Sequence, residues 1–329
     1  MNGSASALFS GIVDYAGLFP PAKLAMDTVV GHYARYRGGP RAWMLGRLII
    51  PTGRFDEFAD ALAAARPKID EPWHLSALGT GGDDADDFPD SVRRDVAAIN
   101  RLGARTGGAI IVDAYEKRLP VSMVGGAGRS PLADRVMAAM DALLTGGVVP
   151  ISAVFEIGFA ENWPERVPVV VAALADAGMR VRERFCADAN VAAKIRTGGV
   201  RAAMFPSCEQ VAGFIGACRT SHVAFKATAG LHHPFRHFDE ALQTHMHGFV
   251  NVLAAAGLAW RDGLDDTVLA DILADQTVSH FALDDNGLVW RGRRVPVEGF
   301  GAMRASAMLG FGSCSFGEPV EDLIAAGWL

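Results

Sequence analysis

The sequence predicts an α/β protein whose fold is a (β/α)8 barrel of the TIM type, with helical and hairpin decoration toward the C-terminus. Short apolar runs alternate with helical periodicity along most of the 329 residues, and half of these residues are hydrophobic, which suffices for a large core. No GxGxxG motif follows the first apolar run, so a doubly wound dinucleotide-binding sheet is less well supported. We therefore expect a single barrel domain over residues 1–329, in which residues 238–297 form an insertion or decoration before the last strand.

The expected strands are short apolar runs bounded by glycine, proline or charged residues. The opening segment 12–23 contains Pro20-Pro21, so we expect either a first strand or a loop that plugs one barrel end, with a structural role for Asp14. The runs 180–188, 194–199 and 200–207 compete for one place, because two parallel strands need a crossover of about ten residues or more between them. The other expected strands cover 45–51, 74–79, 108–116, 149–158, 223–228 and a last run from Met308.

Glycines are the main stop signals for the helices between these runs. A helix from about Asp27 ends at Gly38-Gly39, one from Ser91 is closed by Gly103, and one after the fourth run ends at Ala177 before Gly178. One more helix has a shared apolar face after the run 45–51, formed by Phe55, Phe58, Ala59 and Leu62.

The C-terminal third contains the expected decoration. Ser207 and Gln210 suit a capping box at a helix start. Residues 238–256 are expected to form one long helix, with His245 on its inner face and His247 on its polar side. Asn286-Gly287 suits the two-residue turn of a hairpin over 281–295.

Composition and charge exclude several classes of partner. The 31 basic and 37 acidic residues give a net charge of −6, and no polybasic block suggests nucleic acid or an anionic membrane surface. No segment reaches the roughly 18 apolar residues of a membrane span, and the N-terminus lacks a basic start followed by an apolar run. We therefore expect a cytoplasmic protein with a small-molecule substrate, and homo-oligomerisation stays open. The four cysteines have no CxxC pairing and are expected to be reduced, small buried hydrophobes: Cys186, Cys208, Cys218 and Cys314.

Lys226 is the strongest candidate for a functional residue. In a strand over 223–228 it shares a face with Thr228, and a loop with His232, His233 and His237 follows. A buried ammonium must be paired or have its pKa lowered, and a lowered pKa makes the amine a nucleophile.

Two acidic residues are candidates for moving protons. Glu156 shares a face with Ser152 and Val154 and lies at a strand end, where barrel enzymes keep their catalytic groups. Asp113 lies in the run 108–116, toward its C-terminal end.

The segments KIRTGG, at 194–199, and FKATAG, at 225–230, resemble the class I, Schiff-base aldolases of the deoxyribose-phosphate aldolase type. In that family a Lys-Thr-Ser-Thr-Gly strand end precedes, by one α/β unit, a strand with a second lysine and glycines. The resemblance implies that Lys194 forms the Schiff base, that Lys226 is the neighbouring cation that lowers its pKa, and that Asp113 takes the place of an aspartate acid/base. Ile195 and Arg196 depart from the family pattern, and the match covers about a fifth of the chain.

We therefore expect a lyase that acts on a small carbonyl compound through a lysine Schiff base, with no metal or other cofactor. The predicted catalytic residues are Lys226, Lys194, Glu156, Asp113 and His232. The predicted substrate-binding residues are Arg196, Thr228, His233, Ser313 and Ser315, the last two in a loop whose amides precede a helix near Pro319.

Two alternatives remain. In one, His232, His233 and His237 bind a divalent metal with Glu156 or Asp113, as in a metal-dependent hydrolase or lyase, although adjacent histidines in an extended loop point apart. In the other, the barrel binds a small ligand without catalysis. That alternative is favoured if Lys194 and Lys226 form plain salt bridges with Glu156 and Glu183.

Overall fold

The computed structural model describes residues 3–158, 162–186 and 189–329. Over these residues eight strands form a closed parallel barrel in the order β1-β13-β7-β6-β5-β4-β3-β2, with helices between them, which confirms the predicted fold class. The barrel strands are β1 (Val13–Tyr15), β2 (Leu45–Pro51), β3 (Trp73–Leu78), β4 (Ile110–Arg118), β5 (Ser152–Glu156), β6 (Asn190–Arg196), β7 (Phe225–Thr228) and β13 (Met308–Ser313).

The chain divides into two compact units, which we describe separately. The first unit contains Met1–Lys23, Tyr36–Gly46 and Ile195–Leu329, and the second contains Leu24–Arg35 and Arg47–Lys194. None of the helices in the described ranges combines the length and the hydropathy needed to cross a lipid bilayer.

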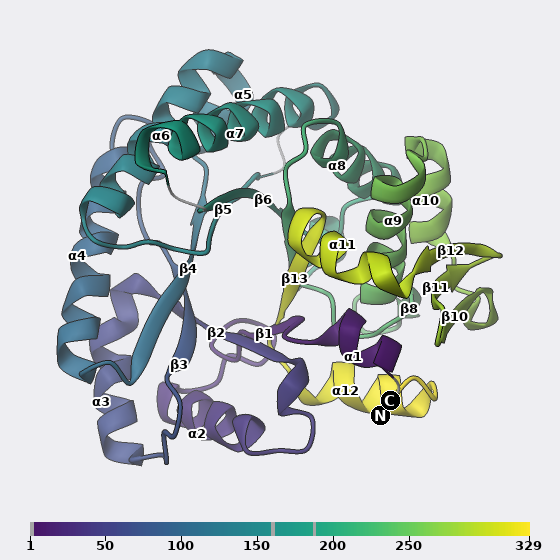
Figure 1. Ribbon diagram of the computed structural model, residues 1–329, viewed down its shortest axis with the longest axis horizontal. Coiled ribbons are helices and arrows are strands. Elements are labelled where there is room, and N and C mark those ends of the chain that lie inside the picture. The colour runs from purple at the N-terminus through teal and green to yellow at the C-terminus, as the bar shows by residue number, and fades with distance from the viewer. Residues whose placement is uncertain (1–2, 159–161, 187–188) are drawn as a thin grey trace. The chain divides into compact units, whose positions relative to one another are not determined.

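In the second unit, helices cover one face of the strands. Figure 1 shows α3, α4, α6 and α7 following one another outside β3, β4 and β5. These helices are expected to pack on the strands through apolar residues with helical spacing. In α3, all the residues of the predicted apolar face are buried. These helices are α3 (Phe55–Ala65), α4 (Phe88–Thr106), α5 (Val121–Gly126), α6 (Arg129–Thr145) and α7 (Trp163–Phe185), preceded in the chain by α2 (Met26–Arg37).

Two predicted helix ends in this unit were wrong. Helix α4 continues past Gly103 and ends at Gly107, which adopts a left-handed conformation. Helix α7 continues past Gly178 to Phe185, so residues 180–185 are helical. Cys186 caps the helix in a left-handed conformation, and residues 187–188 of the run lie outside the described residues. A Cβ on Gly178 would lie 3.5 Å from Val191 Cβ, an ordinary packing distance, so this position lies where α7 packs on β6 and the glycine does not stop the helix.

In the first unit, the predicted helix over 238–256 was also wrong. Two antiparallel strands, β8 (His237–Asp239) and β9 (Thr244–Met246), come first, and the helix α9 (Phe249–Asp262) starts only after Gly248. The Asp239 side chain accepts a hydrogen bond from the Leu242 amide, and Gln243 has a positive φ, which closes a turn that a helix would not tolerate. His247 is consequently buried and does not lie on a polar helix face.

The other elements of the first unit pack around α9, whose residues are buried from Phe249 to Ala259. The Ser207/Gln210 capping box is present at the start of α8, as predicted. The predicted hairpin is part of a three-stranded sheet, but its turn is Asp285-Asn286, since Gly287 already pairs with Asp284. These elements are α1 (Gly3–Phe9), α8 (Cys208–Thr220), α10 (Asp266–Ala274), β10 (Phe281–Asp284), β11 (Gly287–Trp290), β12 (Arg293–Pro296), α11 (Phe300–Ser306) and α12 (Gly317–Ala325).

Short 3₁₀ helices complete the connections between these elements. They cover Ala42–Met44, Thr52–Arg54, Ala202–Met204, Val278–His280 and Val297–Gly299. Residues 200–207 therefore contribute no barrel strand. Three predicted runs competed for this place in the barrel, and the strand found there is β6, which ends within the run 194–199.

Candidate active site

Lys194 lies between two buried carboxylates in the second unit. Its Nζ is 2.7 Å from Glu116 Oε2 and 3.1 Å from Glu156 Oε2. Ser76 Oγ donates to Glu116 Oε1 at 2.6 Å. We call these four residues, all of which are buried, the Lys194 cluster.

Strand register explains how the cluster forms. β4, β5 and β6 are neighbours, and Glu156 on β5 lies directly opposite Lys194 on β6. In β4, Tyr115 and Lys117 contact Asp95 of α4, so the intervening Glu116 points to the face of the sheet away from the helices. The cluster therefore lies on the strand face that the helices leave uncovered.

A register shift separates Asp113 from this cluster. Pairing between β3 and β4 slips at Leu75/Ser76, so that Asp113 is the extra residue of a bulge. Its carboxylate binds Arg47 Nε at 2.6 Å and His74 Nδ1 at 2.8 Å. The structure thus brings Glu116, and not Asp113, next to Lys194.

Electrostatics in the cluster favour a charged lysine. Burial lowers the pKa of Lys194, but the charges and hydrogen bonds of Glu116 and Glu156 raise it more, so that the pKa is well above its ordinary value. At neutral pH the resting side chain is an ammonium ion. The lowered pKa expected from a neighbouring cation is therefore wrong for Lys194.

In the first unit, Lys226 forms a buried ion pair with Asp14. The two residues lie on β7 and β1, which flank β13, and the β13 residues opposite them are Gly310 and Gly312. Because these positions have no side chains, Lys226 and Asp14 can meet across the strand between them. From the sequence, only a structural role was expected for Asp14, and the one signal for more was its position as a lone carboxylate in an apolar run.

For a non-catalytic barrel, Lys194 and Lys226 were expected to form salt bridges with Glu156 and Glu183, and the observed ion pairs agree with this only in part. Lys194 does pair with Glu156, but its second partner is Glu116, and Lys226 pairs with Asp14. Glu183 lies at the exposed end of α7.

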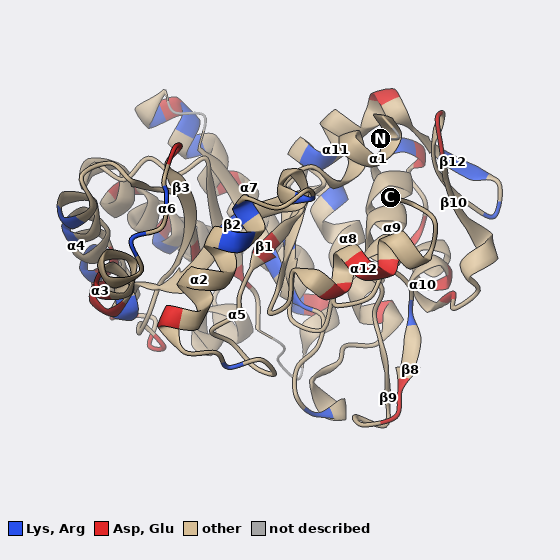
Figure 2. Cartoon of the chain, turned by 90° about the horizontal axis from the view of Figure 1, so that it is seen from below, with Lys and Arg blue, Asp and Glu red and all other residues tan. Residues whose placement is uncertain are grey.

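The histidine loop contacts the acidic helix α12. His232 Nδ1 lies 2.7 Å from Glu318 Oε2, and His233 Nδ1 lies 2.5 Å from Asp322 Oδ2. Figure 2 shows acidic residues in red along α12. His237 Nδ1 lies 3.1 Å from the Phe235 carbonyl oxygen.

Metal coordination finds no support in this loop. Among the described residues, no group of three or more His, Cys, Asp and Glu side chains is arranged to hold a metal ion. The partners of these histidines are two carboxylates, a backbone carbonyl oxygen and, for His232, the Cys314 thiol, so the metal-dependent alternative lacks a ligand set among the described residues of this loop.

The predicted binding residues of the first unit lie at strand ends. Arg196 and Thr228 are the last residues of β6 and β7, and Ser313 is the last residue of β13. The Ser315 amide donates to Ser313 Oγ at 3.4 Å, and the Glu318 amide donates to Ser315 Oγ at 3.2 Å. The two serines therefore shape the turn into α12.

A second buried network lies on the helix side of β4. Asp95 Oδ2 accepts hydrogen bonds from Tyr115 Oη at 2.7 Å and Lys117 Nζ at 2.9 Å. Its Oδ1 accepts from Thr52 Oγ1 at 2.5 Å and from the Thr80 amide at 3.2 Å. Burial and the Asp95 charge raise the pKa of Tyr115 well above its usual value, so the phenol stays protonated and donates.

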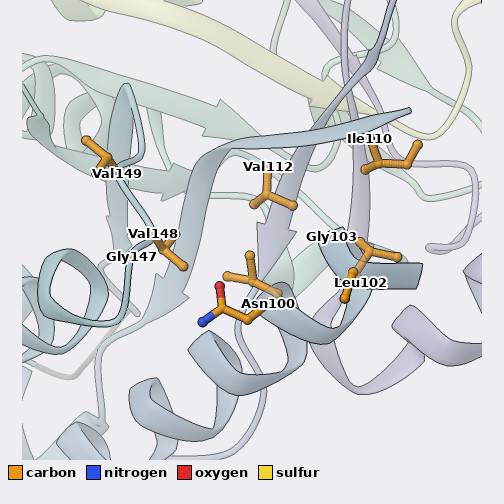
Figure 3. A pocket seen from close by; sticks show the side chains of 10 residues that line it. Asn100, Leu102, Gly103, Ile110, Val112, Gly147, Val148 and Val149 are labelled. Atoms are coloured by element: carbon orange, nitrogen blue, oxygen red, sulfur yellow. The ribbon is translucent and has the colours of Figure 1, made fainter. Parts of the chain in front are cut away.

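A pocket of about 400 Å³ in the second unit is distinct from the cluster. Figure 3 shows it between α4, the start of β4 and the segment before β5. Ile110 and Val112 line it at the N-terminal end of β4, whereas Glu116 lies further along the strand. Apart from Asn100, its lining residues have apolar side chains or are glycines, and none of them is titratable.

Comparison of the chain with protein-family models and with curated proteins found no match. The function is therefore inferred from the side-chain geometry.

Proposed function

We propose that the protein is a lyase that makes or breaks a carbon–carbon bond in a small carbonyl compound through an imine on Lys194. One observation carries the proposal: a buried lysine lies between two buried carboxylates on the strand face away from the helices. Such a group combines a nucleophile with two proton carriers.

The raised pKa of Lys194 is compatible with imine chemistry. An ammonium ion and a carbonyl give an iminium ion and water, so the charge on the nitrogen does not change over the whole reaction. Glu116 and Glu156 stabilise the ammonium, and from the same positions they would stabilise the iminium. The two carboxylates therefore change the overall equilibrium of imine formation little. The attacking amine must still lose its proton before it can add to the carbonyl.

Glu156 supplies the proton transfers, and Glu116 remains the electrostatic partner of the lysine. Glu156 Oε2, 3.1 Å from Nζ, accepts the ammonium proton, and the free amine adds to the carbonyl carbon while a proton moves from the nitrogen to the carbonyl oxygen. The protonated carboxyl then gives its proton to the carbinolamine hydroxyl, which leaves as water. The iminium is an electron sink for cleavage of the adjacent carbon–carbon bond: Glu156 accepts the proton of the β-hydroxyl group, the β-carbon leaves as a carbonyl compound, and Glu156 returns that proton to the carbon of the resulting enamine. Ser76 donates to Glu116, which fixes that carboxylate as the electrostatic partner.

Lys226 is the second candidate nucleophile. It is as deeply buried as Lys194, with 4% of each residue exposed, and it forms an ion pair with the carboxylate of Asp14. The resemblance to the class I aldolases assigns the imine to Lys194, and the two-carboxylate environment supports the same assignment.

A non-catalytic barrel that binds a small ligand is the second candidate function. The observation that favours it is that both candidate lysines, Lys194 and Lys226, form ion pairs. In that case the lysines balance buried negative charge and form no covalent adduct.

Borohydride trapping distinguishes the two candidates. The protein is incubated with a panel of aldehydes and keto acids, reduced with borohydride, and digested for mass spectrometry. We expect a reduced adduct on Lys194 with at least one carbonyl compound, and none in Lys194→Met. Lys117 is the internal control, because it is a buried, ion-paired lysine on the helix side of β4. An adduct confined to Lys226 would move the nucleophile there, and no adduct on either lysine would favour the binding function.

The role of Glu156 is tested in the same experiment. Glu156→Gln keeps the shape of the side chain but cannot accept the ammonium proton, so we expect slower adduct formation by roughly 10²-fold or more. Glu57→Gln is the matched control, since Glu57 is an exposed glutamate of α3 paired with Arg54. Equal rates for the wild type and Glu156→Gln would contradict the proposed proton transfer.

A further inference from the structure

Cys314, His232 and Glu318 form a chain of three interacting side chains in the first unit. Cys314 Sγ lies 3.8 Å from His232 Nε2. The other ring nitrogen, Nδ1, lies 2.7 Å from Glu318 Oε2. One imidazole therefore links a thiol to a carboxylate.

The fold places these residues together. Cys314 directly follows β13, and Glu318 lies in the first turn of α12, which begins at Gly317. His232 lies in the loop after β7, and β7 is the parallel neighbour of β13. The carboxyl ends of parallel neighbours meet at one edge of a sheet, so the loop and the turn lie side by side.

The arrangement has the chemical order of an activated nucleophile. A carboxylate beside Nδ1 holds the proton of the imidazole on that atom, and the lone pair of Nε2 then faces the sulfur. Burial raises the pKa of Cys314, a backbone hydrogen bond from Ala22 opposes this, and the nearby Glu318 charge adds to the rise. The sulfur therefore rests as a thiol and needs a base to become a nucleophile.

We infer that Cys314 is a nucleophile for acyl groups, with His232 as its general base and Glu318 as the residue that positions the imidazole. The substrate class is an activated ester or thioester. In the first step the thiol proton moves to His232 Nε2, a bond forms between Sγ and the acyl carbon, and the bond from that carbon to the leaving oxygen or sulfur breaks. The leaving group takes the proton from His232. Water then adds to the acyl-cysteine with His232 again accepting a proton, and the carboxylic acid departs as the thiol is restored.

p-Nitrophenyl acetate is the probe for this site. With the full chain in excess reagent we expect a burst of about one p-nitrophenolate per chain, and mass spectrometry should locate the acetyl group on Cys314. Cys314→Ser should abolish both. Acetylation confined to Cys186, an exposed cysteine after α7, or to lysines would overturn the inference.

Variants of His232 and Glu318 show whether His232 acts as a general base or only packs against Cys314. We expect His232→Gln to slow acetylation of Cys314 roughly 10²-fold or more, because the general base is lost. Glu318→Gln should give a smaller slowing, since it keeps a hydrogen-bond acceptor for Nδ1 but removes the charge. His245→Gln, on hairpin β8–β9, is the control and should not change the rate. An unchanged rate in His232→Gln would contradict the inference.

Alkylation of the wild-type protein tests the reactivity of Cys314 without any variant. Cys314 and Cys218 are both buried, with 8% and 0% exposure. We expect iodoacetamide to alkylate Cys314 at least tenfold faster than Cys218 in the folded protein. Equal rates, followed over time by peptide mass spectrometry, would show that Cys314 is only a packed thiol.

Discussion

Glu156 and Lys194 lie directly opposite each other in the parallel strands β5 and β6, and their side chains meet at 3.1 Å. Both are almost completely buried. Two unlike charges at neighbouring positions of a sheet, shielded from water, stabilise each other, so this pair is sensitive to the loss of either partner.

The first prediction concerns the stability contributed by Lys194. Lys194→Met leaves Glu116 and Glu156 buried without their shared ammonium, so we expect a loss of roughly 3–5 kcal/mol in the free energy of unfolding. Urea denaturation at neutral pH measures it. Lys68→Met is the control, because Lys68 is exposed and pairs with Asp70 on the surface. A loss as small as that of the control would show that the carboxylates do not need this lysine.

The second prediction concerns the network around Asp95. Asp95→Asn leaves Lys117 buried without a carboxylate, and we expect a loss of roughly 3–5 kcal/mol. Tyr115→Phe removes one hydrogen bond to a charged group, for which we expect roughly 1.5–3 kcal/mol. Thermal and urea unfolding of both variants should keep this order. A reversed order would mean that the tyrosine, and not the ion pair, holds β4 to α4.

The third prediction is a pH dependence that originates at His247. Burial lowers the pKa of His247 to about 4, a hydrogen bond to the Pro206 carbonyl opposes this, and the charge of Arg236 adds to it. His247 Nε2 lies 2.8 Å from that carbonyl oxygen, and Nδ1 lies 3.2 Å from Arg236 Nη1, so the neutral ring fits both partners.

Between pH 6.5 and about 4 the unfolded chain binds a proton at His247 that the folded chain does not bind. Stability from this residue is therefore complete above pH 6.5 and falls as the pH decreases, by about 3 kcal/mol at pH 4. Unfolding free energies from pH 4 to 7 should have a shallower slope in His247→Gln than in the wild type. The same slope in both proteins would contradict the prediction, and His222→Gln, at an exposed histidine, is the control.

The fourth prediction compares two glycines of the three-stranded sheet. Gly287 has φ +139°, and a Cβ there would overlap the Val295 carbonyl oxygen. Gly292 has φ +79°, with open space around its Cβ position. We expect Gly292→Ala to cost roughly 1–2 kcal/mol from backbone strain alone. Gly287→Ala should cost more, toward the upper end of roughly 0.5–3 kcal/mol, because strain and overlap add. Equal melting temperatures for the two variants would contradict this.

Several elements could be predicted because their signals are local. The run 45–51 forms β2 with the predicted bounds, and Ser207 with Gln210 caps α8. The buried face of α3 follows the spacing of its apolar residues. Each of these features depends on residues a few positions apart, whose hydrogen bonds and packing are set by the chain itself.

Two predictions were wrong because a residue or an apolar spacing has a different role in the folded chain from the one that its local pattern indicates. Gly178 reads as a helix stop, but it lies where α7 packs against Val191 of β6, and the helix continues. The apolar spacing over 238–256 suits a helix, but the turn at Asp239 and Gln243 divides it into a hairpin and α9. A single sequence carries no sign of either contact.

The sequence alone predicted that this chain is an α/β barrel, that Lys226 lies in a buried strand and that Glu156 lies at a strand end, because apolar residues on both sides of a charged one place it in the interior, whereas Lys194 was selected through the resemblance. Tertiary structure alone decided which groups meet: Glu116 reaches Lys194 after the bulge at Asp113, Asp14 reaches Lys226 across the glycines of β13, and His232 joins Cys314 to Glu318. These partners lie far apart in the chain, and the register of parallel strands, set by packing over the whole barrel, brings them together.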